Sequence, residues 1–194
     1  MAVLRPVVLA LVVYWFGGAA GTHADEASDR TAAAYDRYRQ PEKIMAALAL
    51  GRGQRVADIG AGGGYLTFRI ADAVGPEGLV VATDVDDDAL RVLRAKAEGR
   101  PNVVVRKVAP DQPGLEPGRF DLIVLSEVDQ YLPDREAYLG KLRPALAPRG
   151  RIAVTNRIRF RAPLIDAARR AGYEVAGETT GLPAQFLLFL ETRR

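Results

Sequence analysis

The sequence predicts an α/β fold: a doubly wound, mostly parallel seven-stranded sheet with a C-terminal antiparallel hairpin and helices on both faces. Three observations carry this prediction. Short apolar runs alternate with helical patterns from residue 40 onward, and the first run passes directly into a glycine-rich turn. Two β-rich runs joined by a short turn then close the chain with no helix between them.

The first strand is expected at residues 56–59, where it leads into a turn with the spacing Gly60-x-Gly62-x-Gly64 and then into a helix. Glycines let the backbone approach a ligand closely, and a helix N-terminus offers unpaired N–H groups. The stretch therefore predicts a site for a nucleotide-like ligand. Its spacing differs from the G-x-G-x-x-G of dinucleotide-binding folds.

The remaining elements follow in alternation, with Asp86 expected to cap one helix. Helices are expected at residues 28–39, 42–50, 136–147 and 162–171 and after the Asp86 cap, and the hairpin is expected at 173–179 and 185–191.

Composition bounds the function. The length of 194 residues suits one domain, and 48% apolar with 26% charged residues is typical of a globular core. A net charge of +3 is too small to indicate nucleic-acid binding. The chain has no cysteine, which excludes disulfides and thiolate metal sites, and no metal is expected.

With Asp58 in front, the glycine turn resembles motif I of the class I S-adenosylmethionine-dependent methyltransferases. The family's second to fifth strands resemble residues 78–86, 102–108, 120–125 and 150–155, and the likeness runs from about residue 36 to the C-terminus. The chain most resembles the small-molecule and lipid methyltransferases of the ubiquinone-biosynthesis type. The resemblance implies methyl transfer from S-adenosylmethionine to a small-molecule or lipid acceptor.

The resemblance also implies which residues hold the cofactor. Asp58 would orient the turn, the turn would pass close to the methionine carboxylate, and Asp84 could accept hydrogen bonds from the ribose diol. Many family members carry an acid at the position of Ala109; Asp111 could serve instead, or could simply form the turn. The expected set is Asp58, Gly60, Ala61, Gly62, Gly64, Asp84, Val85, Asp111 and Glu127.

The segment after the fourth strand would lie beside the methyl acceptor. It lacks the Asn/Asp-Pro-Pro-Tyr/Phe motif, and the one histidine, His23, lies outside the expected domain, so no histidine base is available. Aligning the acceptor and excluding water can supply much of the rate. Glu127 and Asp129 are the candidates to accept a proton; solvated loop acids are the plain alternative.

Two sets of basic or aromatic residues could either contact a ligand or have only a structural role. In similar methyltransferases the leading helices cover the methionine end of the cofactor, which draws attention to Tyr35, Arg37, Tyr38 and Arg39. Arginines alternating from residue 157 to 161 could meet anionic lipid headgroups. A packed helix and a solvated face are the default interpretations.

Residues 1–24 read as a signal peptide or membrane anchor ahead of a domain over residues 25–194. Arg5 precedes an apolar stretch, and small residues surround His23. The expected location is therefore exported (periplasmic or extracytoplasmic) or membrane-anchored. Because S-adenosylmethionine is made in the cytosol, an anchored domain facing the cytosol is the alternative.

Three other functions stay open at this point. One is a catalytically inactive S-adenosylmethionine-binding protein, suggested by Ala109 and the missing histidines. Another is a protein methyltransferase. The third is an NAD-dependent oxidoreductase, which the glycine spacing and the closing hairpin disfavour. The sequence carries no signal for an oligomeric state.

Overall fold

The computed structural model describes residues 36–193, and the chain divides into Met1–Arg37 and Tyr38–Arg194. The expected signal or anchor at residues 1–24 lies outside the described residues, as does most of the helix expected at 28–39. Within the part that the structure describes, no helix is both long and apolar enough to cross a membrane.

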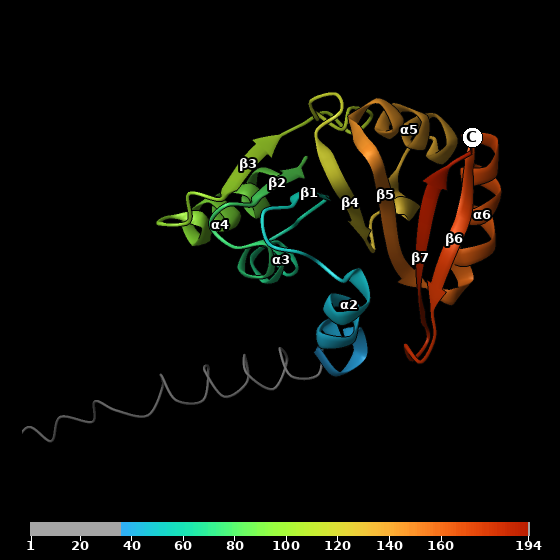
Figure 1. Ribbon diagram of the computed structural model, residues 1–194, viewed down its shortest axis with the longest axis horizontal. Coiled ribbons are helices and arrows are strands. Elements are labelled where there is room, and N and C mark those ends of the chain that lie inside the picture. The colour runs from blue at the N-terminus through green and yellow to red at the C-terminus, as the bar shows by residue number, and fades with distance from the viewer. Residues whose placement is uncertain (1–35, 194) are drawn as a thin grey trace, which may run out of the picture. The chain divides into compact units, whose positions relative to one another are not determined.

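The described residues form one seven-stranded sheet in the order β3-β2-β1-β4-β5-β7-β6 (Figure 1). Neighbouring strands are parallel from β3 to β5, and β7 is antiparallel to both β5 and β6, which confirms the expected closing hairpin. The strands are β1 (Arg55–Ile59), β2 (Leu79–Asp84), β3 (Val103–Lys107), β4 (Phe120–Ser126), β5 (Leu146–Arg157), β6 (Tyr173–Thr179) and β7 (Gln185–Thr192).

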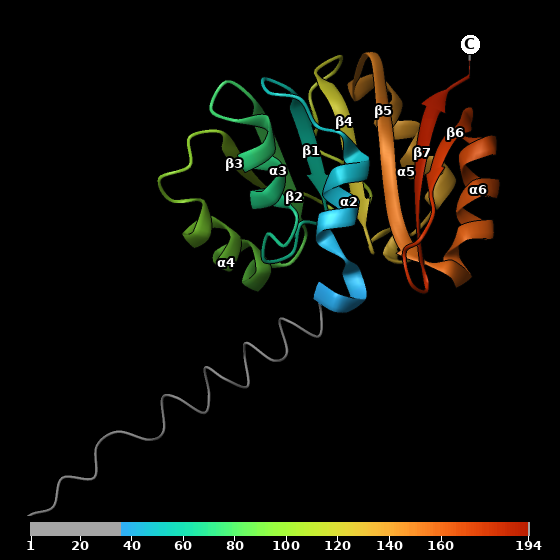
Figure 2. The same ribbon diagram turned by 60° about the horizontal axis from the view of Figure 1, so that its bottom comes forward.

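Helices cover both faces of the sheet, with α2, α3 and α4 on one and α5 and α6 on the other (Figure 2). The helix expected at residues 136–147 is shorter, because Pro144 has no N–H to continue it, and β5 already begins at Leu146. The helices are α2 (Pro41–Leu48), α3 (Thr67–Val74), α4 (Asp87–Ala97), α5 (Arg135–Leu142) and α6 (Arg161–Arg170), with 3₁₀ turns η1 (Asp129–Tyr131), η2 (Arg143–Ala145) and η3 (Ile158–Phe160).

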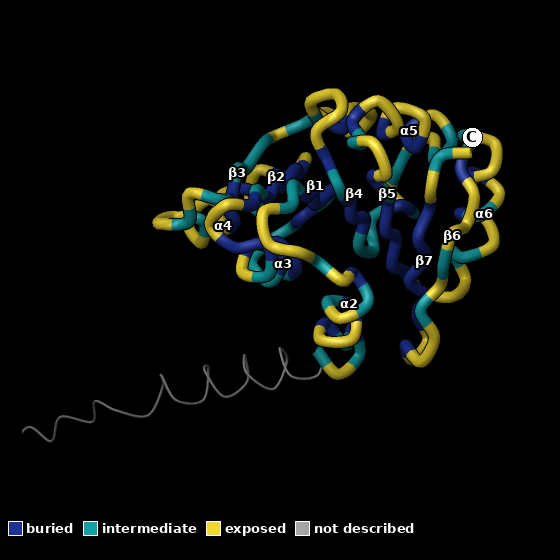
Figure 3. The backbone as a smooth tube through the Cα atoms, viewed as in Figure 1, coloured by how far each residue is buried: buried dark blue, intermediate teal, exposed yellow. Residues whose placement is uncertain are grey.

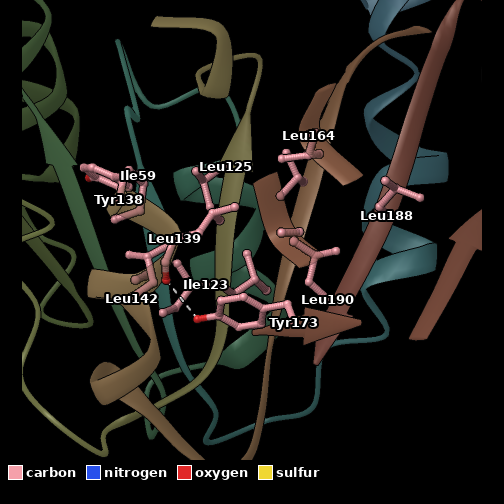
Figure 4. Packing of buried hydrophobic residues seen from close by; sticks show 14 of the residues in the cluster. Ile59, Ile123, Leu125, Tyr138, Leu139, Leu142, Leu164, Tyr173, Leu188 and Leu190 are labelled. Carbon is pink, nitrogen blue, oxygen red and sulfur yellow. Dashed lines mark hydrogen bonds between the residues drawn. The ribbon is translucent and has the colours of Figure 1, made fainter. Parts of the chain in front are cut away.

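Alternation along the central strands feeds a core on each face. In β1, Ala57 and Ile59 pack on the side of α5 and α6, and Val56 packs on the side of α2 and α3. Strands β1, β2, β4 and β7 are mostly buried, whereas the edge strand β6 and the outer helix surfaces are exposed (Figure 3). On the α5 side, the Tyr173 hydroxyl donates to the Leu139 carbonyl at 3.0 Å (Figure 4). This bond satisfies an orphan carbonyl in the last turn of α5.

The strand order reverses between β1 and β4: β1 leads to β2 on one side, while β4 lies on the other. In open parallel sheets, ligands bind at the carboxyl ends of the strands at such a switch point. The glycine turn after β1, Asp84 at the end of β2 and the segment after β4 all lie at this edge. The fold therefore gathers there the residues that the sequence singled out.

Candidate functional site

The glycine turn is tied to the end of β2 by two backbone bonds. The N–H groups of Gly60 and Ala61 donate to the Thr83 carbonyl at 2.8 and 3.0 Å. Gly60 has a φ of +67°, and a Cβ there would lie 2.1 Å from Val128 Cγ2. A Cβ on Gly62 would meet nothing within 4 Å, although its φ is +55°. Gly60 is thus fixed by close packing, while the space beside Gly62 is open.

Asp84 anchors the same turn from the end of β2. One carboxylate oxygen accepts the Gly62 N–H at 2.7 Å, and the other accepts the N–H groups of Val85 and Asp86 at 2.7 and 2.9 Å. A carboxylate offers about four lone-pair sites, so one acceptor position remains for a ligand hydroxyl. The Asp86 carboxylate accepts the Ala89 N–H and caps α4, as expected from the sequence.

A cavity of about 230 Å³ lies at the switch point. One side is apolar and comes from the segments after β2 and β3, and the other comes from the segment after β4. It is lined by Ile59, Gly60, Thr83, Asp84, Val85, Val108, Ala109, Pro110, Val128, Tyr131, Leu132 and Tyr138. Gly60, Asp84 and Val85 are thus brought together at the cavity.

Asp111 is not among the residues that line this cavity. Its carboxylate accepts a hydrogen bond from Lys141 Nζ at 3.0 Å, and this bond lowers the pKa of Asp111 below its ordinary value. Ala109 and Pro110 line the wall where many members of the resembled family carry an acid, so that wall is apolar. The sequence could not anticipate the pairing with Lys141, because the two residues lie 30 positions apart.

Asp58 lies near the end of β1, just before the turn, and is 2% exposed. Burial raises the pKa of Asp58 to about 6; the hydrogen bond from Thr67 lowers it, the charge of Asp84 raises it, and the charge of Arg39 lowers it. The Thr67 hydroxyl donates to the Asp58 carboxylate at 2.6 Å, which joins β1 to the start of α3. Asp58 therefore ties the strand before the turn to the helix after it.

Glu127 begins the segment after β4 in a left-handed conformation, with a φ of 54°. Its carboxylate forms an ion pair with Arg39 at 2.7 Å and accepts a hydrogen bond from Gln185 at 2.9 Å. The Arg39 side chain is 10% exposed and the Glu127 side chain is 16% exposed. Glu127 does not line the cavity, and its carboxylate is engaged rather than solvated.

Asp129 is 1% exposed and organises the same segment. Its carboxylate accepts hydrogen bonds from Asn156 and from Arg135, and Arg135 also donates to the Asp129 carbonyl. Burial raises the pKa of Asp129, and these bonds oppose the shift. Asn156 also donates to the Gln130 side chain. Asp129 is therefore buried and connects the segment after β4 to Arg135 and Asn156, and the interpretation as a solvated loop acid is wrong.

Sequence reasoning missed Asn156 and Gln185 entirely. Both are polar and buried, and both lie at the edge where β5 ends and β7 begins. A polar residue directly after an apolar strand was the available signal for Asn156. Arg39, which the sequence placed on a leading helix, is 8% exposed, and its guanidinium carbon lies 4.9 Å from the centroid of the Tyr65 ring.

Residues 57–152 match the family model described as a methyltransferase domain. The chain is 33% identical over 106 residues to nocamycin O-methyltransferase of Saccharothrix syringae, covering 54% of this chain and 38% of that enzyme. It is 34% identical over 112 residues to aklanonic acid methyltransferase DauC of Streptomyces sp. strain C5, covering 57% and 50%. The chain belongs to the class I S-adenosylmethionine-dependent methyltransferases.

Solved structures of other methyltransferases have the same fold as this chain. A methyltransferase from Aquifex aeolicus has a TM-score of 0.73 at 21% identity, covering 80% of this chain and 90% of that one. A TehB-like methyltransferase from Corynebacterium glutamicum has a TM-score of 0.67 at 20% identity, covering 90% and 97%. The chain spans about half the length of the curated relatives that it matches.

The residues present fit S-adenosylmethionine, the cofactor that the family implies. The apolar wall of Val85, Val108 and Ala109 suits an adenine ring, and Asp84 offers an acceptor to a ribose hydroxyl. The buried carboxylates of Asp58 and Asp84 suit a ligand that carries an ammonium and a sulfonium. Among the described residues, no group of three or more histidine or acidic side chains could hold a metal.

Proposed function

We propose that this methyltransferase transfers a methyl group from S-adenosylmethionine to a small-molecule acceptor. The observation that carries the proposal is Asp84, which holds the glycine turn through Gly62 while lining a cavity with an apolar wall. A dinucleotide-binding enzyme would place a pyrophosphate against its glycine turn. Here a buried acid, Asp58, lies just before the turn instead, which favours a ligand with a cationic end.

The finer choice of acceptor rests on the relatives. Their names describe O-methylation of nocamycin, methylation of aklanonic acid, and C-methylation in ubiquinone and menaquinone biosynthesis. We propose an acceptor of the same kind, an oxygen or carbon centre on a small molecule or lipid. Tyr131, which is 77% exposed at the cavity, offers an aromatic surface to such an acceptor.

When bound, the cofactor supplies an activated methyl group. The chain's part is to orient the acceptor and exclude water, because the two acids after β4 are both engaged in buried bonds. The Asn156 bonds to Asp129 and Gln130 hold that segment in place beside the cavity. Val128, packed against Gly60, sets the distance between the segment and the glycine turn.

We also propose that residues 1–24 direct the protein for export or anchor it in a membrane. Fusing a reporter that is active on only one side of the membrane after residue 24 would assign the side. Export would require the cofactor to reach that compartment. A cytosolic signal with membrane fractionation would support the anchored form facing the cytosol.

A methyl-transfer assay tests the function. The full chain is incubated with S-adenosylmethionine labelled in the methyl group and with a panel of quinols, phenols, carboxylic acids and lipid extracts. Label in an organic-soluble product supports the proposal, and label in a protein band indicates a protein acceptor instead. Cofactor binding without transfer to any acceptor would indicate a binding protein that has lost catalysis.

A further inference from the structure

The buried ion pair between Arg39 and Glu127 lies at the edge of the glycine turn. Arg39 reaches it from the segment before α2, and Glu127 reaches it from the end of β4. The Arg39 guanidinium also stacks on Tyr65, which directly follows Gly64. The arginine therefore bridges the turn and the segment after β4. Three buried or half-buried acids, Asp58, Asp84 and Glu127, share this neighbourhood.

A carboxylate ligand entering beside the turn would meet these acids, so it needs a cation. Arg39 is placed to supply this positive charge. Its charge already acts on Asp58, and its guanidinium lies over the ring of Tyr65. A guanidinium can bind a carboxylate through two parallel bonds, which makes it well suited to this exchange. In the structure, however, Arg39 binds the Glu127 carboxylate.

We propose that Arg39 changes partners when the cofactor binds, leaving Glu127 for the carboxylate at the methionine end. Glu127 thus competes with the cofactor for Arg39, and the exchange frees the Glu127 carboxylate, which then keeps its bond from Gln185. This inference rests on the proposed function. Removal of the Glu127 carboxylate should therefore strengthen binding of the cofactor's carboxylate. Removal of a residue that itself binds the cofactor would weaken cofactor binding.

The experiment compares two ligands by calorimetric titration of the full chain. One is S-adenosylmethionine, and the other is the analogue in which hydrogen replaces the carboxylate. The measured quantity is the preference, the ratio of the dissociation constant of the analogue to that of the cofactor. Both ligands carry the sulfonium and the amine, so the ratio isolates the contribution of the carboxylate. Loss of the Glu127 charge alone would also raise this ratio, so the exchange requires that the rise be absent when Glu127→Gln is combined with Arg39→Gln.

For Glu127→Gln, the preference is expected to rise about fivefold or more, the lower end of ordinary coupling between sites. For Arg39→Gln, it is expected to fall toward 1. The matched control is Arg69→Gln: Arg69 stacks on Tyr65 at 4.8 Å and donates to the Tyr65 carbonyl. Its removal should leave the preference within about twofold of the wild-type value.

An unchanged or lower preference in Glu127→Gln overturns the exchange, whatever Arg39→Gln does. Failure of the wild-type chain to bind either ligand overturns the proposed function and the exchange with it. Should Glu127→Gln not fold, Glu127→Asp keeps the charge but shortens the reach to Arg39. It should raise the preference by a smaller factor, and a preference equal to that of wild type would again contradict the exchange.

Discussion

Gly60 is the position at which the close packing of the site can be tested most sharply. A methyl group on Gly60 would lie 2.1 Å from Val128 Cγ2, and the backbone there has a φ of +67°. The left-handed conformation costs a residue with a Cβ about 1–2 kcal/mol, and the overpacking costs about 1–3 kcal/mol more. Gly60→Ala is therefore expected to lower the free energy of unfolding by about 2–5 kcal/mol.

Gly62→Ala is the matched control. Its φ is +55°, but the added methyl would meet nothing within 4 Å, so only the conformational cost of about 1–2 kcal/mol applies. The assay is urea denaturation of both variants, followed by circular dichroism. The unfolding free energies of the two variants can be compared directly when both depend on urea concentration with the same slope.

The decisive measurement is a double-mutant cycle with Val128→Ala. Removing the Val128 methyls makes room for the new methyl, so Gly60→Ala should cost about 1–3 kcal/mol less in the Val128→Ala background. A coupling energy of zero within about 0.5 kcal/mol would refute the packing argument. Equal destabilisation by Gly60→Ala and Gly62→Ala would refute it independently.

Three further outcomes are expected. Because burial raises the pKa of Asp58 from 3.8 to about 6, its stabilising effect is fully present below pH 3.8 and is lost as the pH rises through about 6. Asp58→Asn should flatten the stability-against-pH curve over that range by about 3 kcal/mol, and an unchanged slope would contradict the shift. Asp86→Ala should cost about 1 kcal/mol by removing the cap of α4 yet leave cofactor affinity within about twofold, whereas a tenfold loss would make Asp86 a ligand. Tyr173→Phe should cost about 1 kcal/mol in urea denaturation, because the Leu139 carbonyl loses its donor; no change would mean that water replaces the bond.

The order of strands and helices was predictable from local patterns. Apolar runs such as that of β4, the glycine turn after β1 and the capping Asp86 all act within a few residues. The end of α5 was not predictable from such a pattern. The helical pattern of the sequence continues past Pro144, but Pro144 has no N–H group and the helix stops before it.

The glycine turn and Asp84 were also predictable in place, since both follow apolar strands directly. The partners of the acids were not. Asp111 bonds to Lys141, and Asp129 is buried against Asn156, across separations of 30 and 27 positions. Such pairings depend on which strands become neighbours, and a pattern along the chain does not carry that information. The ion pair of Glu127 with Arg39 could not be predicted for the same reason.

Titration of the full chain with S-adenosylmethionine, with NAD as the control ligand, distinguishes a methyltransferase site from a dinucleotide site. The same titration of Asp84→Ala removes the carboxylate that holds Gly62 and lines the cavity. We expect the wild-type chain to bind S-adenosylmethionine and not NAD, with affinity reduced at least about tenfold in the variant, a loss of about 1.4 kcal/mol. Binding of NAD would contradict the assignment of the cofactor, and equal affinity of the variant and the wild type for S-adenosylmethionine would contradict the role of Asp84.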